Sequence, residues 1–342
     1  MRNQIIKILR QIKQTALDVP KLLWGFLVYS FKKKTPKSAH QSLINLFCLT
    51  GGYSNDILSL PISMLHRPYK IHSAKGVLGD FNREQLKDIS KRINEEGFYI
   101  FENKLPDELC EKLLKFAYTH PATIRGDTIQ YASKEIYVPH EPKAVRYDYE
   151  QQMLIDNAQV QNLITDKSII AVAQNYLRAK PVLDVIGMWW HTAYQKEPDS
   201  SAAQFFHFDM DRIRWLKFFI YLTDVNDESG PHAFVKSSHK NKGIPRHLRA
   251  RGYARIKDEE IFSIYDKENV IYHIAPKGTI IAEDTRGLHK GQHVVRGDRL
   301  VLQLQFSNHL FGADYPSCKF KNKSEKLVEL IAAYPRLYSN YV

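Results

Sequence analysis

The sequence predicts a mainly β core with flanking α-helices, and two observations support this fold class. Apolar residues recur at helical spacing before Pro181, whereas short alternating runs typical of strands dominate after it. In the run 299–307 every second residue is apolar, and the residues between them are polar except Val301. Helices first and strands later favour a strand-built barrel or sandwich with helices packed outside it. The length of 342 residues allows one large domain with added segments, or two small domains.

The composition is that of an ordinary globular protein, with 44% apolar and 25% charged residues. The three cysteines, Cys48, Cys110 and Cys318, lie far apart and form no CxxC pair. We therefore expect no thiolate zinc site and no disulfide scaffold. A reducing, cytoplasmic location is the expectation.

Residues 1–37 carry most of the positive charge. They contain nine Lys or Arg and one acid, Asp18, which gives 9 − 1 = +8 of the total +12. The other 305 residues hold only 12 − 8 = +4. Since the basic character belongs to an arm and the folded body shows no zinc-finger or helix-turn-helix signature, we expect no nucleic-acid partner.

The same arm is amphipathic. Apolar residues recur at helical spacing from Ile5 to Leu17, Pro20 is expected to interrupt the helix, and an apolar run follows at 22–31. Ten residues are too few to span a bilayer, and no cleavage site of a secretory signal follows them. Two interpretations stay open: peripheral membrane contact through residues 1–37, or an extra helix packed on the body.

The remainder divides into three segments: an N-terminal extension at 38–84, a main domain at 85–315 and a C-terminal helical tail at 316–342. Within the extension, Gly51 and Gly52 predict a turn, and 42–48 a short helix. The main domain is expected to begin with a helix capped by Asn82, a buried strand at 98–101 and a helix opening at Pro106. A further helix is predicted at 168–177. The predicted strands are 182–194, 203–209, 215–222, 269–274, 278–283 and 299–307.

The segment Phe206-His207-Phe208-Asp209 carries the first candidate site. Residues two apart share one face of a strand, so His207 and Asp209 point the same way. The flanking phenylalanines indicate that this strand is buried. A neutral imidazole and a carboxylate are two of the three ligands that hold iron(II) in non-haem oxygenases.

A third ligand must come from a distant strand, and His289 is the best candidate. His293 is a competitor four residues later. Ten residues after His289, Arg299 opens a strand with one apolar and one polar face, so its guanidinium would point into a cavity. The guanidinium fork suits a carboxylate such as the distal one of 2-oxoglutarate. Arg296 is a rival to Arg299, but Gly297-Asp298 places it in the turn before the strand.

Other residues near these positions have weaker predictions. Lys217 is expected either to reach a carboxylate of the co-substrate or substrate, or to lie at a solvated strand end. One of Trp189 and Trp190 should face the cavity and the other the core. Asp211 is expected at the solvated surface. A few more are assigned structural roles or loop surface: His232, His239 and the run 146–149.

Together these motifs resemble the phytanoyl-CoA dioxygenase family, and the resemblance covers roughly 85–315. The matching features, in order, are the His-x-Asp at 207–209, the strand and turn at 218–225, Gly-Pro-His at 230–232, Ser-Ser-His-Lys at 237–240, His289 and Arg299. The stretch between Asp209 and the next strand is shorter than in many family members. Contacts made by that longer loop are therefore not transferred.

The resemblance implies a double-stranded β-helix (a cupin-like jelly roll), with iron(II) on His207, Asp209 and His289, and with 2-oxoglutarate and O₂ as co-substrates. Halogenases of this family replace the carboxylate ligand, so Asp209 favours hydroxylation. The expected substrate is a small molecule or a lipid-linked one. Two alternatives remain: a cupin-like metal-binding protein without 2-oxoglutarate turnover, and a membrane-associated protein that keeps the fold as a scaffold.

Overall fold

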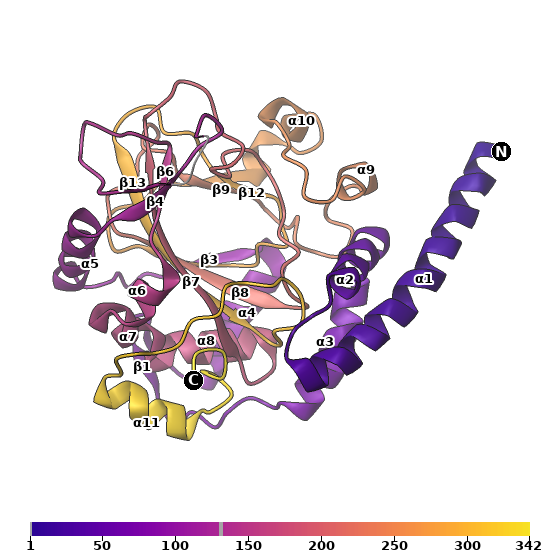
Figure 1. Ribbon diagram of the computed structural model, residues 1–342, viewed down its shortest axis with the longest axis horizontal. Helices are drawn as coiled ribbons and strands as arrows, with labels where there is room; N and C mark the ends of the chain where they lie inside the picture. Colours follow the sequence, from indigo (N-terminus) through magenta and orange to yellow (C-terminus); the bar gives the residue numbers. More distant parts are fainter. Residues whose placement is uncertain (1, 130–132) are drawn as a thin grey trace.

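The core of the protein is built from two antiparallel sheets. The computed structural model describes residues 2–129 and 133–342, and of residues 2–14 the backbone alone. The larger sheet has the order β3-β11-β8-β13-β7-β6-β4-β5 and the smaller one β10-β9-β12 (Figure 1). The larger sheet comprises β3 (Phe98–Ile100), β4 (Ala122–Arg125), β5 (Lys134–Glu135), β6 (Arg146–Asp148), β7 (Val182–Thr192), β8 (Trp215–Tyr221), β11 (Ile280–Glu283) and β13 (Asp298–Ser307). The smaller comprises β9 (His232–Val235), β10 (Val270–His273) and β12 (His289–Gly291).

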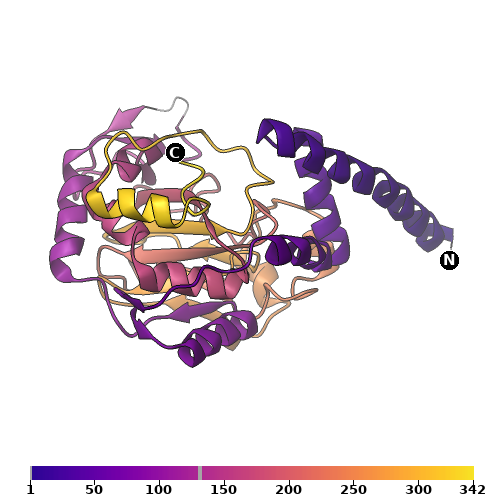
Figure 2. The ribbon, with the colours of Figure 1, turned by 90° about the horizontal axis from the view of Figure 1, so that it is seen from below.

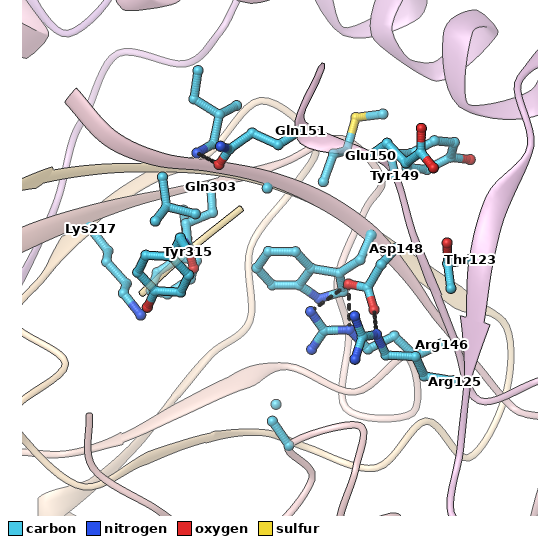
Figure 3. A pocket seen from close by; sticks show the side chains of 18 of the residues that line it. Thr123, Arg125, Arg146, Asp148, Tyr149, Glu150, Gln151, Lys217, Gln303 and Tyr315 are labelled. Carbon is cyan, nitrogen blue, oxygen red and sulfur yellow. Dashed lines mark hydrogen bonds and ion pairs between the residues drawn. The ribbon is translucent and has the colours of Figure 1, made fainter. Parts of the chain in front are cut away.

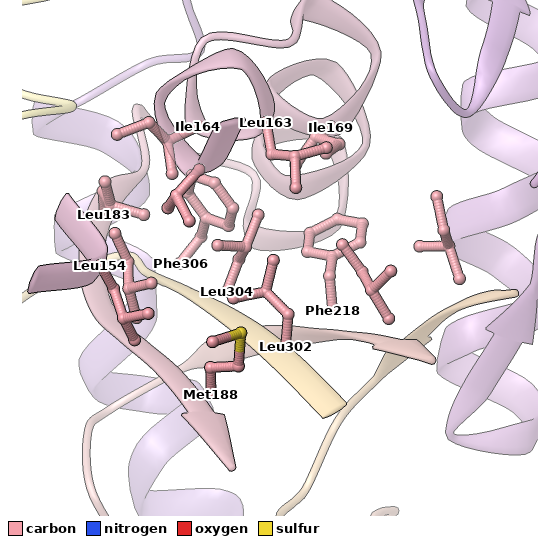
Figure 4. Close-up of a cluster of buried hydrophobic side chains, with 14 of the residues drawn as sticks. Leu154, Leu163, Ile164, Ile169, Leu183, Met188, Phe218, Leu302, Leu304 and Phe306 are labelled. Carbon is pink, nitrogen blue, oxygen red and sulfur yellow. The ribbon is translucent and has the colours of Figure 1, made fainter. Parts of the chain in front are cut away.

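Strand β13 lies at the centre of the larger sheet and shows why the sequence alternates there. It pairs with β7 on one side and β8 on the other. Its apolar side chains pack against helices in the main hydrophobic core (Figure 4), namely Leu300, Leu302, Leu304 and Phe306. Arg299 and Gln303, on the opposite face, line a cavity between the two sheets. The predicted two-faced strand is therefore confirmed.

Helices cover the outer face of the larger sheet. The principal ones are α4 (Arg83–Glu96), α5 (Asp107–Thr119), α6 (Gln151–Ile155), α7 (Ala158–Ile164), α8 (Lys167–Leu177) and α11 (Glu325–Ala333). Asn82 caps α4 as predicted, in a reciprocal capping box with Gln85. The predicted β core with flanking helices is confirmed. The short elements are β1 (Ala74–Gly76), β2 (Gly79–Phe81), α9 (Arg246–Arg249), α10 (Asp258–Phe262) and the 3₁₀ turn η1 (Lys267–Asn269).

Three N-terminal helices pack together at one end of the molecule: α1 (Arg2–Lys32), α2 (Lys37–Thr50) and α3 (Tyr53–Leu65). They share a hydrophobic cluster that includes Leu22, Leu43 and Ile62. The N-terminal part of α1 projects away from the body (Figures 1 and 2). No helix of the described chain is long and apolar enough to cross a membrane.

Two predictions of local structure are wrong, and helix α3 was not predicted. Helix α1 runs through Pro20 without interruption. The short helix predicted at 42–48 is confirmed as part of the longer α2, whereas α3 covers residues for which no helix was predicted. Packing compensates for the poor local signal: at Gly25 an added Cβ would lie 2.2 Å from the Cβ of Ala39, so the glycine permits the close approach of α1 and α2. The predicted strand 203–209 is reduced to isolated bridges at Phe206 and His207.

Candidate metal centre

His207, Asp209 and His289 meet at one point between the sheets, although the two histidines are 82 positions apart in the sequence. One ligand atom from each lies within 4.8 Å of the others. The Nε2 atoms of His207 and His289 lie 4.0 and 3.6 Å from the Asp209 carboxylate. Two imidazole nitrogens and one carboxylate oxygen are a donor set that suits iron(II), so the residues fit the metal that the sequence predicts.

The backbone brings the two histidines together. His207 and His289 exchange both main-chain hydrogen bonds, at 3.0 and 2.9 Å, as an antiparallel pair. The amide of Asp209 donates to the carbonyl of Thr285 at 2.8 Å. The segment that bears the His-x-Asp motif is therefore joined to the segment before β12 without forming a regular strand. We call this pairing of 207–209 with 285–289 the ligand seam.

Each imidazole is oriented by its own chain. The Nδ1 of His207 lies 2.9 Å from the carbonyl of Phe205, and that of His289 lies 2.9 Å from the carbonyl of Gly287. A carbonyl accepts only, so each Nδ1 carries the proton and each Nε2 is left with its lone pair. Burial lowers the pKa of both histidines. Both are thus held in the neutral form that coordinates a metal.

The third candidate ligand, Asp209, is held as a carboxylate. Burial alone would raise its pKa, but the ammonium of Lys217 holds it well below its usual range. The Nζ of Lys217 donates to Asp209 at 2.6 Å. The structure thus places Lys217 on a candidate metal ligand, and its predicted contact with a co-substrate stays a prediction. Asp211 is buried 3.8 Å from the same ammonium, so the expectation of a solvated Asp211 is wrong.

A buried ion pair between Asp284 and Arg286 stabilises the segment 285–289 of the ligand seam. Asp284 accepts two hydrogen bonds from Arg286, at 3.0 Å to Nε and 2.6 Å to Nη2, and a third bond from the hydroxyl of Tyr176. Between them, Thr285 accepts from the indole of Trp215 at 2.8 Å. Sequence reasoning missed this support. The Asp-x-Arg spacing five and three residues before His289 was the available signal.

Arg299 lies across the cavity from the ligands and has no carboxylate partner among the described residues. Its Nη2 donates to Nδ1 of His191 at 2.7 Å, and its Nη1 donates to the carbonyl of Gly230. Its Nε is buried without a partner. Burial lowers the pKa of Arg299 to about 10. A buried guanidinium without an anion is costly, which favours an anionic ligand in front of it.

The cavity that joins these groups has a volume of about 740 Å³. Trp189 lines it, whereas Trp190 is fully buried in the core, as the alternation predicts. Part of the cavity wall is polar (Figure 3): Arg146 stacks on Trp189 at 4.5 Å and donates to Asp148 at 2.7 Å. The run 146–149 was expected at the loop surface or, less strongly, in a substrate-binding loop. Residues 146–148 of this run instead form β6, and Arg146, Asp148 and Tyr149 line the cavity.

Behind His289 lies a buried group that the sequence did not indicate. The Oε2 atom of Glu283 is hydrogen-bonded to Nε2 of His232 at 2.9 Å. The Nε2 atom of His273 lies 3.8 Å from the same oxygen. Burial raises the pKa of Glu283 to about 8 and lowers that of His232 to about 3. The proton of this pair therefore resides on Glu283 at neutral pH. His232 also borders the cavity, so its role is not confined to a turn.

The rival residues lie elsewhere. His293 points its Nδ1 at Gln204, 3.3 Å away, and is outside the ligand group. Arg296 is 82% exposed in the turn before β13. His239 contacts the carbonyl of Asn94 at 3.1 Å, in keeping with a structural role.

This fold and this site define a class, the jelly-roll proteins that hold one metal ion with two histidines and a carboxylate. The model of the family described as "Phytanoyl-CoA dioxygenase (PhyH)" matches residues 93–294, more than half of the chain. The chain belongs to the phytanoyl-CoA dioxygenase family, and the resemblance found in the sequence is confirmed. No curated protein sequence matches the chain.

Several solved structures are similar to this chain. EctD from S. alaskensis with bound Fe gives a TM-score of 0.50 at 15% identity, over 73% of this chain and 85% of that one. Its apoform gives 0.51 at 16% identity, over 80% and 90%. The alpha ketoglutarate dependent epimerase SnoN from nogalamycin biosynthesis gives 0.49 at 18% identity, over 66% and 84%. The likeness to EctD supports the jelly-roll fold.

Proposed function

We propose that the protein is an iron(II)- and 2-oxoglutarate-dependent oxygenase that hydroxylates its substrate. The observation that carries the proposal is one cavity with three converging metal ligands on one wall and Arg299, a buried cation without an anion, on another. The family is a dioxygenase family, and a structural relative, EctD, holds Fe. When bound, iron(II) supplies oxygen activation coupled to decarboxylation of 2-oxoglutarate.

The chain's own residues position the reactants. His207, Asp209 and His289 would hold the ion with three protein ligands, which would leave coordination positions for the co-substrate and O₂. Arg299 binds the distal carboxylate through its fork, and His191 fixes the orientation of that fork. Trp189 and Phe219 line the cavity between them and exclude water. Because Asp209 occupies the carboxylate position, no vacancy for a halide exists at the metal, and this supports hydroxylation.

The substrate we propose is a small polar molecule, free or as the head group of a lipid. The outer part of the cavity presents hydrogen-bonding and charged groups: Thr123, Arg125, Arg146, Asp148, Glu150, Gln151 and Gln303 (Figure 3). Paired charges such as Arg146 with Asp148 suit hydroxyl and amide groups, whereas an unbranched acyl chain would offer these polar groups no hydrogen bond. An uncharged or zwitterionic ligand of this kind also leaves Arg299 to the co-substrate.

Succinate formation tests the chemistry without knowledge of the substrate. The purified protein, reconstituted anaerobically with iron(II) and ascorbate and then exposed to O₂, should convert 2-oxoglutarate to succinate slowly and without substrate. The His289→Ala variant should not. Metal binding without succinate would instead support a cupin-like metal protein, and absence of metal binding a scaffold. With substrate in hand, label from ¹⁸O₂ should enter the product; a chlorinated product in chloride buffer would contradict hydroxylation.

A further inference from the structure

Helices α1 and α3 expose two continuous apolar faces that the proposed chemistry does not use. The exposed apolar side chains of α1 are Leu17, Val19, Leu23, Trp24, Leu27 and Phe31. Those of α3 are Tyr53, Ile57, Leu60, Met64 and Leu65. Phe31 is 82% exposed and Met64 is 72% exposed. Apolar residues scattered singly on a surface are ordinary, whereas contiguous apolar faces mark interaction sites.

Helical geometry shows that each face lies opposite the face that packs on the body. On α1, Leu22, Gly25 and Phe26 turn inward, so Leu23 and Leu27 point away from them. On α3, Ser59 and Ile62 are buried, and Ile57, Leu60 and Met64 lie opposite. Both helices contribute to the same inner cluster, so both outer faces belong to the end of the molecule where α1 projects (Figure 2).

The charges around these faces are almost all positive. Residues 15–66 contain five lysines: Lys21, Lys32, Lys33, Lys34 and Lys37. Of these, Lys34 pairs at the surface with Asp314, an acid outside this stretch. The same stretch contains two acids, and neither presents an unpaired negative charge that would repel anionic lipids. Asp18 is 2% exposed and accepts from Ser42, and Asp56 pairs with Arg286 and Asn241. An apolar face rimmed by lysines, without free acids, matches an anionic lipid surface.

We propose that the outer faces of α1 and α3 form one docking surface for an anionic lipid bilayer. Apolar side chains enter the acyl boundary, Trp24 lies at head-group depth, and the lysines meet lipid phosphates. The sequence predicted possible membrane contact for residues 1–37 alone. The proposed surface also includes α3, for which the sequence predicted no membrane contact. This docking does not depend on the proposed reaction.

The docking surface also lies near the active cavity. A hollow of about 580 Å³ is lined by Tyr29, Lys33 and Lys34 at the end of α1. It shares the segment 315–317 with the wall of the metal cavity. A lipid-linked substrate held at the bilayer would therefore meet the protein beside the cavity entrance.

Vesicle flotation of the full-length protein tests the surface. We expect binding to vesicles of equimolar phosphatidylcholine and phosphatidylglycerol that weakens at high salt, and much weaker binding to pure phosphatidylcholine. Two double variants test the two helices: Leu23→Glu/Leu27→Glu on α1 and Ile57→Glu/Met64→Glu on α3. Each should lower the vesicle partition constant by about tenfold or more, since each places charge on an apolar face that would enter the bilayer. Succinate formation should be unchanged in both, which separates docking from chemistry.

The matched control is Val328→Glu, an exposed apolar position on α11 that is not part of the surface. It should bind vesicles like the unmodified protein. Equal binding of all variants, or no binding by the unmodified protein, would overturn the proposal, and unchanged binding of the α3 variant would remove α3 from the surface. A dimer in light scattering that dissociates in the α1 variant would assign these faces to a second copy of the chain instead.

Discussion

Arg299 donates from Nη2 to Nδ1 of His191, 2.7 Å away, and the two residues face each other across the β13–β7 ladder. An arginine donates only, so Nδ1 must accept, and Nε2 carries the proton that it donates to the carbonyl of Ala202 at 3.0 Å. Burial and the Arg299 charge lower the pKa of His191 far below its usual range. His191 is therefore a neutral residue that positions Arg299.

His191→Phe should impair the use of 2-oxoglutarate more than turnover. Loss of a bond to a charged group costs ~1.5–3 kcal/mol, so KM for 2-oxoglutarate should rise roughly tenfold or more with a smaller change in kcat. Initial rates of succinate formation measure both. His191→Gln, which can accept from Arg299, should recover part of the loss. Equal effects on KM and kcat in both variants would indicate a merely structural role.

Arg299→Ala should raise KM for 2-oxoglutarate far more steeply. Breaking a buried pair costs ~3–5 kcal/mol, which corresponds to a change of more than about a hundredfold. Metal affinity should be unchanged, because Arg299 contacts no ligand of the metal centre. The exposed Arg296→Ala is the matched control and should leave KM unaltered. An unchanged KM in Arg299→Ala would reject its assignment to the co-substrate.

His289→Ala should lower iron(II) affinity by more than ~100-fold, since even partners outside the ligand set often cost 10–100-fold. Equilibrium titration with iron(II) or an inert divalent ion measures this. His293→Ala should bind metal normally, because its imidazole points at Gln204. The opposite ranking of the two variants would move the third ligand to His293.

Asp284→Asn should destabilise the fold by ~3–5 kcal/mol at neutral pH, because the buried Arg286 would lose its buried charge partner and keep only the more exposed Asp56, 3.3 Å away. Urea unfolding gives this difference. Burial alone would raise the pKa of Asp284, but Arg286 holds it well below its usual range. A carboxyl with a depressed pKa stabilises above its unfolded pKa and loses that contribution as pH falls through the folded one. The deficit should therefore shrink in acid.

The control for this measurement is Asp314→Asn, which removes the surface ion pair with Lys34. Both side chains are more than half exposed, so the change should stay within ~0.5 kcal/mol. Comparable losses at the two positions would show that the support behind the ligand seam contributes nothing special to stability.

The sequence predicted the strands and ligands whose signals are local. Strand β13 alternates, Asn82 caps α4, and the His-x-Asp motif lies between phenylalanines, so residue type and spacing sufficed. Arg299 was found because its strand presents one polar face to the cavity. The assignment of all these residues to a reaction remains a prediction.

What the sequence did not predict depends on distant partners. The segment around His207 is not a regular strand, because it forms one isolated bridge with His289 and another, through Phe206, with Ile256. Helix α1 continues through Pro20 since packing on α2 outweighs the local break. Likewise, neither the position of Asp284 behind the ligands nor that of Glu283 beside His232 leaves a local pattern. Both positions depend on tertiary structure: β11 pairs with β8, and the smaller sheet packs against the larger one.

The ligand seam should make backbone hydrogen exchange sensitive to metal occupancy. His207 and His289 are joined by only two main-chain hydrogen bonds, and a metal ion would add a second connection through their side chains. Without metal, this pairing should open locally far more often than the long ladders of β13. With metal, every opening must first release the ion, so the amide protons of both histidines should exchange with solvent more slowly in proportion to metal affinity. Deuterium uptake at these two amides would thus measure loading of the centre in the absence of any turnover.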